Sequence, residues 1–298
     1  MELLPGLAII DAMNTLTATL SAPSGAPSMS RTVGDMLRDW RQRRRMSQLL
    51  LASEAEISTR HLSFVESGRA QPSREMVMHL AERLDVPLRA RNALLVAAGY
   101  APLYRERQLS DPQLDAARAA IDLVLKGHEP YPAVAIDRHW TIVAANNALA
   151  PLLTAAKPAL LEAPVNALRL SMHPDGIASQ IANWHAWRAH LLSRLQRQVD
   201  VSADPTLAAL YDELAAYPTP PDADESPASP LEQIAVPLRL RTEIGVLSFF
   251  STTTVFGTPV DVTLSELAIE AFFPADPQTA EALRKFADTR ASSDSASD

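Results

Sequence analysis

Apolar residues recur at helical spacing in five short stretches of the first hundred residues. The stretches span residues 33–46, 48–56, 59–67, 74–84 and 89–100. In the first stretch, Leu37 and Trp40 lie on one face of a helix and the arginines lie on the other. Ser47 and Ser58 occupy positions typical of helix N-caps, and Gly68 stands where left-handed backbone ends a helix. The pattern predicts a unit of five helices.

The pattern changes after residue 108, where helical and alternating segments are mixed. An amphipathic helix over 112–126 precedes two short alternating segments joined by a turn at Asp137 and Arg138, which predict a β-hairpin. A helical stripe covers 171–199. Three further strands are predicted at 237–242, 245–253 and 261–273, and a closing helix at 274–288. We therefore expect an α+β fold, in which an all-α five-helix unit precedes an antiparallel sheet of about five strands with helices on one face.

Composition and pattern together divide the chain into segments. Residues 1–30 are rich in Ala, Ser, Pro and Thr, and we expect them to form a disordered leader. Met1, Met13 and Met29 are each a candidate for the natural first residue. The remaining segments are the helical unit 31–107, the mixed unit 108–290 and a disordered tail 291–298. Within the mixed unit, the Pro-rich acidic stretch 217–230 predicts a flexible loop that buries nothing.

Several classes of function are excluded by composition. The 298 residues include no cysteine, so disulfides, thiolate metal sites and cysteine nucleophiles are ruled out, which favours a cytoplasmic location. The 9 glycines are too widely spaced for a phosphate-binding loop. No apolar run reaches the length of a membrane span, and the N-terminus lacks the basic start of a signal peptide. We therefore expect no membrane partner.

The net charge of −8 hides an asymmetry between the two units. Residues 31–107 carry 14 arginines, no lysine and 9 acidic residues, whereas residues 108–298 carry 13 basic and 24 acidic residues. Guanidinium groups suit phosphates and guanine edges well. The first unit is therefore a candidate for nucleic-acid binding, although its RQRRR run at 41–45 also fits a solvated helix face.

Residues 33–100 resemble a helix-turn-helix domain of the XRE, or lambda-repressor, type. The resemblance rests on residues in register: Leu37, Arg41, Ser47, Gln48, Ala52, Ile57, Ser58, Leu62, Ser63, Glu66, Gly68, Pro72, Ala81 and Leu84. It implies that the second and third helices read DNA and that Arg41 and Glu66 form a partly buried ion pair rather than two solvated charges. Glu56 stands where the family has glycine, so we expect this turn to be reshaped locally.

The same resemblance implies how DNA is contacted. Bases are expected to meet the third helix at Thr59, Arg60, Ser63 and Phe64, with Arg60 on guanine and Phe64 on thymine methyl groups. Phe64 folded beside His61 is the alternative. Phosphates are expected at the starts of the second and third helices. The residues expected to contact or attract them are Gln48, Ser58, Arg43, Arg44, Arg45, Arg69 and Arg74. The partner is then double-stranded operator DNA, and because such regulators bind two-fold sites we expect a homodimer held by the second unit.

The second unit resembles the PAS-like ligand-binding domain of MmyB-like transcription regulators. The segments that carry the resemblance are HEPYPAVAIDRHWTIVAANNA, MHPDGI, NWHAWR and FFSTTTVFGTPVDVTLSELAIEAFFPAD. Together the two resemblances cover roughly residues 33–288. They imply a bacterial regulator controlled by a small apolar ligand, with a fatty-acid-like molecule as the leading choice and no other cofactor.

The candidate ligand-binding residues form an apolar and aromatic wall, with Arg188 placed to meet a carboxylate. The other members are Trp140, Met172, His173, Ile177, Ile181, Trp184, Trp187, Phe249 and Phe250. The same residues also fit an ordinary hydrophobic core with Arg188 at its rim. A further alternative is that the second unit binds a protein partner instead of a small molecule.

We expect neither a metal site nor an enzyme. His185 and His190 are five residues apart, which places them about 140° apart around a helix, and His173 falls in a turn. No metal-binding spacing, nucleophile-elbow motif or recognisable acid/base pair is present in the sequence. No catalytic residue is therefore assigned.

Overall fold

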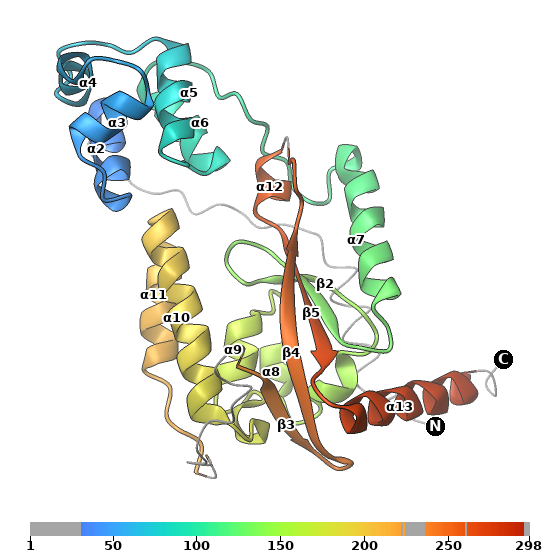
Figure 1. Cartoon of the computed structure of the whole chain (residues 1–298). Coiled ribbons are helices and arrows are strands. Elements are labelled where there is room, and N and C mark those ends of the chain that lie inside the picture. The colour runs from blue at the N-terminus through green and yellow to red at the C-terminus, as the bar shows by residue number, and fades with distance from the viewer. Residues whose placement is uncertain (1–30, 222, 224–235, 260, 295–298) are drawn as a thin grey trace.

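The computed structural model describes residues 31–221, 223, 236–259 and 261–294 (Figure 1). The predicted leader at 1–30 and most of the predicted loop at 217–230 lie outside these residues, as do the last four residues of the predicted tail.

The first unit consists of five helices, as predicted. They are α2 (Val33–Arg43), α3 (Gln48–Glu54), α4 (Thr59–Glu66), α5 (Arg74–Arg83) and α6 (Leu88–Ala97). The hydroxyls of Ser47, Ser58 and Ser73 cap α3, α4 and α5, each accepting a hydrogen bond of 3.0 to 3.2 Å from the backbone amide three residues on. Leu37 of α2 and Leu62 of α4 are fully buried in the core that these helices share.

The turns after α2, α3 and α5 all use left-handed backbone at a residue other than glycine. The φ angles are 55° at Arg45, 52° at Glu56 and 47° at Asp85. After Glu56, the amide of Ile57 donates to the Ala52 carbonyl at 2.9 Å and closes the turn. The expectation that Glu56 reshapes this turn is therefore wrong, because the chain accepts the left-handed conformation at a cost of roughly 1–2 kcal/mol.

Helices α2 and α4 approach closely at Gly34. A Cβ atom at this position would lie 2.4 Å from the backbone oxygen of Val65 and 2.9 Å from that of Glu66. No side chain fits at such a distance from backbone, so glycine is required for α4 to lie where it does.

The second unit is built on one antiparallel sheet of five strands in the order β2-β1-β5-β4-β3. The strands are β1 (Ala133–Ile136), β2 (Ile142–Ala145), β3 (Leu238–Thr242), β4 (Gly245–Val255) and β5 (Ala268–Pro274). Strands β1 and β2 form the predicted hairpin, in which Val134 pairs with Ala145. The α+β class and the five-stranded antiparallel sheet are thus confirmed.

Helices lie on both faces of this sheet, which corrects the prediction of helices on one face. On one face, α7 (Asp115–Gly127) packs with Ile121 and Leu125 against Ala133 and Ala135 of β1. The alternate residues of β1, such as Val134, join the larger core on the other face. That core also takes in η2 (Ala150–Leu153), α9 (Ala167–Met172), α10 (Trp184–Ser202) and α11 (Pro205–Ala215).

Two predicted elements are shorter than expected. The segment 261–273 begins with a helical turn, α12 (Val262–Ser265), because the Asp261 carboxylate accepts a hydrogen bond from the amide of Thr263 at 2.9 Å and caps it. Strand β5 starts only at Ala268. The stripe at 171–199 is also interrupted, since α9 ends at Met172, a 3₁₀ turn η3 (Ala178–Gln180) follows, and α10 starts at Trp184.

Two segments expected to be disordered are partly ordered. The closing helix α13 (Pro277–Asp294) extends through 291–294, so the first half of the predicted tail is helical. Tyr217, at the start of the predicted loop, packs partly against the core and its hydroxyl donates to Glu213 Oε1 at 2.5 Å. The remaining short elements are η1 (Pro112–Leu114) and α8 (Pro158–Leu161).

Candidate functional site

Helix α4 is held in place by a buried ion pair between Arg41 of α2 and Glu66 of its own last turn. Arg41 Nε donates to Glu66 Oε1 at 2.6 Å, and Arg41 Nη2 donates to Oε2 at 2.8 Å. Gln48 Nε2 of α3 also donates to Oε2, at 2.7 Å. Burial by itself raises the pKa of Glu66, but the hydrogen bonds from Arg41 and Gln48 outweigh it and hold the pKa below its ordinary value. The predicted pair is therefore present, and it ties α4 to α2 and α3.

Two side chains predicted to contact phosphates are engaged within the five-helix unit. The amide of Gln48 is bonded to Glu66. Arg44 Nε donates to the Leu84 carbonyl at 2.8 Å and Nη2 to that of Asp85 at 2.7 Å, while the guanidinium lies over the Trp40 ring. Carbonyls at a helix end lack partners within the helix, so Arg44 completes the end of α5. The roles predicted for Gln48 at a phosphate and for Arg44 as electrostatic support stay predictions.

The outward side of α4 carries the residues predicted to contact bases. Thr59 and Arg60 are exposed, and Ser63 and Phe64 are half-buried. The Phe64 ring has two guanidinium groups over it, with Arg60 Cζ 5.3 Å and Arg69 Cζ 5.8 Å from its centroid. Each contact is a cation–π interaction, which orients the arginine without using its hydrogen-bonding groups. The helix therefore presents an aromatic ring in contact with two arginines.

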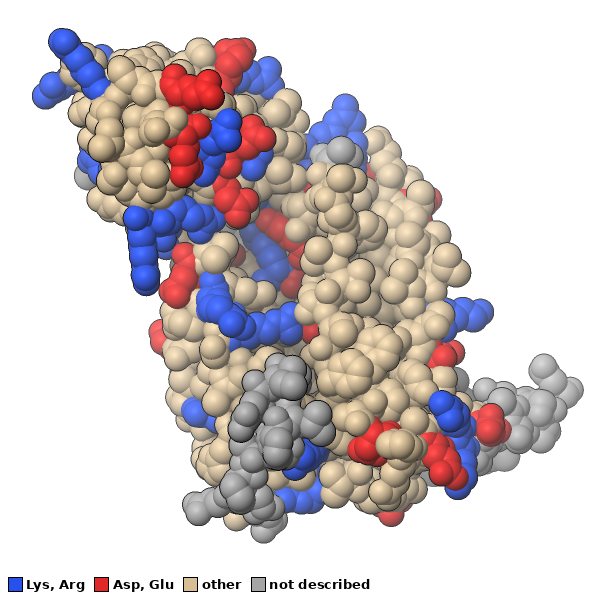
Figure 2. All heavy atoms as spheres, in the orientation of Figure 1, with Lys and Arg blue, Asp and Glu red and all other residues tan. Residues whose placement is uncertain are grey.

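Basic side chains gather around this helix. Figure 2 shows basic side chains, all of them arginines in the five-helix unit, at its outer corner over α4. Arg43, Arg45, Arg69 and Arg74 are all exposed. Ser58, also predicted at a phosphate, uses its hydroxyl to cap α4 by accepting from the amide of His61 at 3.1 Å.

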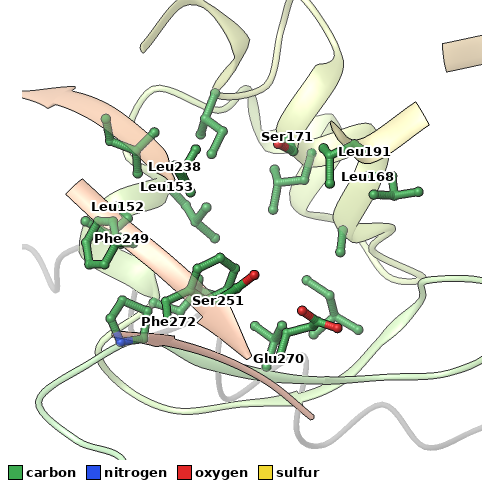
Figure 3. Close-up of a pocket in the computed structure, with 18 of the residues that line it drawn as sticks. Leu152, Leu153, Leu168, Ser171, Leu191, Leu238, Phe249, Ser251, Glu270 and Phe272 are labelled. Carbon is green, nitrogen blue, oxygen red and sulfur yellow. The ribbon is translucent and has the colours of Figure 1, made fainter. Parts of the chain in front are cut away.

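The second unit contains a cavity of about 100 Å³ between the sheet and helices α9 and α10 (Figure 3). Four of the predicted ligand-binding residues line it: Trp140, Ile177, Trp187 and Phe249. Leucines supply much of the rest of the wall, including Leu153, Leu168, Leu191 and Leu238. An apolar cavity of this kind suits an apolar ligand.

The other six predicted residues do not line the cavity. Met172, Ile181 and Trp184 are fully buried in the surrounding core. His173 meets the Tyr217 ring edge-on at 5.0 Å. The remaining two are Arg188 and Phe250.

Arg188 and Phe250 each follow a residue that lines the cavity but do not line it themselves. Phe250 follows Phe249 along β4, so it points to the opposite face of the sheet, where it stacks on Phe273 at 5.3 Å. Arg188 is one residue past Trp187 on α10 and donates from Nη2 to the Ala215 carbonyl at 2.7 Å. The arginine on the cavity side of α10 is instead Arg194, seven residues after Trp187.

A charged pair in the cavity wall was missed from the sequence. Arg194 Nη1 donates to Glu270 Oε2 at 3.0 Å, and Nη2 donates to Oε1 of the same carboxylate. Nη2 also donates to Thr253 Oγ1 at 3.0 Å, and the guanidinium lies 4.6 Å from the centroid of the Trp140 ring. The sequence did contain a sign of this pair. Glu270 stands in the middle of the apolar run AIEAFF, and a buried charge requires a partner.

Three histidines of the second unit, His128, His173 and His190, pack against aromatic rings. His190 stacks on Trp187 at 5.6 Å, and burial, followed by the charges of Arg194 and Arg197, lowers the pKa of its imidazole. Among the described residues, no group of three or more His, Cys, Asp or Glu side chains is arranged to hold a metal ion. No described helix has both the length and the apolar character required to span a bilayer.

The two units are joined by ion pairs at α6. Arg89 of α6 donates to both oxygens of Glu266, at 2.8 and 2.9 Å, and also pairs with Glu106. Arg107, in the segment between the units, donates from Nη1 to the Asp261 carboxylate at 2.7 Å. Glu266 directly follows α12, which lies near α6 in Figure 1. It stands four residues before Glu270, so the same stretch of chain contacts α6 and lines the cavity.

Comparisons with known families agree with this division. Residues 37–90 match the family model described as helix-turn-helix. Residues 117–286, more than half of the chain, match the model described as the MmyB-like transcription regulator ligand binding domain. Among curated proteins, none matches the chain.

Proposed function

Because the chain belongs to the family of MmyB-like transcription regulators and carries a helix-turn-helix, we propose that α4 reads operator DNA under the control of a small ligand held in the cavity. DNA binding is supported above all by the outward side of α4, where Arg60 and Arg69 lie over Phe64. The Arg41–Glu66 pair holds this helix in place. We assign the chain no catalytic role.

In this proposal α4 lies in the major groove. Arg60 forms a forked contact with a guanine edge, and Phe64 contacts thymine methyl groups, with Thr59 and Ser63 beside them. The Phe64 ring supports the guanidinium of Arg60, since their centres are 5.3 Å apart. Arg43, Arg69 and Arg74 contact phosphates and set the register without reading sequence.

The proposed ligand is a small molecule with a hydrocarbon chain, similar to a fatty acid in its apolar part. The cavity of about 100 Å³ is smaller than the ~150 Å³ apolar cavity that accepts benzene, so it holds only a short alkyl segment as it stands. A longer chain requires its walls to move apart. Such a movement gives the ligand different affinities for two conformations, which is the requirement for control.

The proposed assembly is a homodimer joined through α7. One exposed stripe of this helix is apolar, with Leu123 74% and Val124 46% exposed. The smaller residues Ala116, Ala120 and Gly127 are exposed on the same side. This apolar face also favours the alternative of a protein partner, and a dimer of the purified chain distinguishes the two.

Selection of duplexes from a random pool by the purified full chain tests the proposal. We expect recovery of a two-fold sequence whose half-sites are about one helical turn, or a multiple of it, apart. Recovery of unrelated sequences only, with affinity that depends on salt alone, would refute sequence reading by α4.

A further inference from the structure

The polar part of the cavity is built around Arg194 and Glu270. The side chain of Glu270 is 5% exposed and that of Arg194 is 19% exposed. The carboxylate receives hydrogen bonds from both Nη atoms of Arg194 and, at 2.9 Å, from the hydroxyl of Thr253. Figure 3 shows the Glu270 carboxylate near the hydroxyl of Ser251 in the cavity wall. Charge is therefore present in the wall, and each charged group already has its partner.

The charges in this wall cancel. Arg194 contributes one positive and Glu270 one negative charge, and the other described side chains that line the cavity are uncharged. A ligand carboxylate bound there would add a second negative charge close to Glu270. It would bind Arg194 only by displacing Glu270, which would leave a buried carboxylate without its partner, or by remaining beside it as a like charge.

Uncharged polar groups meet no such penalty. A guanidinium has five N–H groups, and the bonds to Glu270 and Thr253 use three of those of Arg194. Two N–H groups remain to donate to a ligand oxygen. Glu270 Oε1 already accepts from Arg194 and Thr253, but Oε2 accepts only from Arg194 Nη1 and has a lone pair left to accept from a ligand O–H or N–H. A hydroxyl or a primary amide, which both donates and accepts, satisfies both partners without disturbing their pairing.

We infer that the cavity selects ligands with an uncharged hydrogen-bonding end, an alcohol or a primary amide, over the corresponding carboxylate. The inference rests on the proposed role of the cavity as a ligand site and names the chemical class of its ligand. It reverses the expectation of a carboxylate met by arginine, because Arg188 does not line the cavity and Arg194 is neutralised by Glu270.

The test compares three probes with the same alkyl chain: 1-octanol, octanamide and octanoate. Each is titrated into the full chain at pH 8 and followed by tryptophan fluorescence, since Trp140 and Trp187 line the cavity, and by calorimetry. We expect 1-octanol and octanamide to bind at least about tenfold more tightly than octanoate. The difference should shrink as the pH falls towards the pKa of octanoic acid, because the protonated acid is neutral.

A substitution that removes the charge of Glu270 provides a second, independent test. Glu270→Gln removes the negative charge and leaves Arg194 as an uncompensated cation, so octanoate should become the preferred probe. Glu243→Gln, at the exposed turn between β3 and β4, is the matched control and should keep the preference for 1-octanol. If Glu270→Gln does not fold, the comparison of probes on the unaltered chain decides by itself.

The possible results distinguish the ligand site itself from its preference for an uncharged end group. Octanoate bound at pH 8 as tightly as 1-octanol overturns the inference and leaves the ligand site standing. Binding of none of the three probes overturns both the ligand site and the inference. Tighter binding of the alcohol, with reversal in Glu270→Gln, supports both.

Discussion

Arg89 of α6 and Glu266, four residues before Glu270 in the cavity wall, form a two-point ion pair with N–O distances of 2.8 and 2.9 Å. Arg138, in the turn between β1 and β2, also lies 3.7 Å from the Glu266 carboxylate. Glu266 thus joins the DNA-binding unit to two segments that border the cavity. We therefore expect a ligand that moves the start of β5 to change how the five-helix unit is held.

Replacing Glu266 should uncouple ligand from DNA. Glu266→Gln removes the charge that pairs with Arg89, so we expect the change in operator affinity caused by 1-octanol to fall from the roughly 5–150-fold typical of coupled sites to less than about twofold. Fluorescence anisotropy of labelled operator, with and without 1-octanol, measures both values. Glu213→Gln, which affects the exposed pair of Glu213 with Arg169, is the matched control. If 1-octanol changes the operator affinity of Glu266→Gln as much as that of the unaltered chain, the Arg89–Glu266 pair does not couple the ligand to DNA binding.

The Arg41–Glu66 pair should dominate the stability of the five-helix unit. Glu66→Gln leaves Arg41 without its buried partner, and we expect the free energy of unfolding at pH 7 to fall by about 3–5 kcal/mol. Urea unfolding followed by circular dichroism measures the loss. Glu54→Gln, at an exposed position of α3, should change it little.

The same pair predicts a pH dependence. Because folding lowers the pKa of Glu66, its contribution is complete above the ordinary value of 4.5 and is lost as the pH falls through the folded-state pKa. The difference in unfolding free energy between the unaltered chain and Glu66→Gln should therefore shrink below pH 4.5. A difference that stays constant over this range would contradict an ionised Glu66.

The apolar side of α7 should hold the dimer. Leu123→Asp places a charge at its most exposed leucine, and we expect dimerisation to weaken by about 2 kcal/mol or more. Sedimentation equilibrium measures the dissociation constant, and Val201→Asp, at an exposed apolar position of α10, serves as the control. A Leu123→Asp chain that dimerises as tightly as the unaltered one would exclude α7 from the interface.

Local chemistry was sufficient to predict the five helices. Serine caps at Ser47 and Ser58 and the apolar spacing of α2 are short-range signals, and the Arg41–Glu66 pair followed from the family resemblance. The left-handed turn at Glu56 was missed because the surrounding helices over-determine the backbone there.

The cavity was predicted less well, because its wall is assembled from distant segments. Helical spacing identified Trp187, but only the observed start of α10 at Trp184 shows that Ile181 belongs to the preceding segment and that Arg194 shares the side of Trp187. The pairing of Arg194 with Glu270 joins residues 76 apart in sequence. No local pattern specifies such a pair.

Base reading by Arg60 of α4 is tested by comparing the sequence preference of Arg60→Ala with that of Arg69→Ala. We expect Arg60→Ala to lose about 1–3 kcal/mol of discrimination at one guanine position of the operator, while Arg69→Ala weakens binding to all sequences alike and reduces the salt slope by about one. Equal losses on every sequence for Arg60→Ala would show that Arg60 does not read a base.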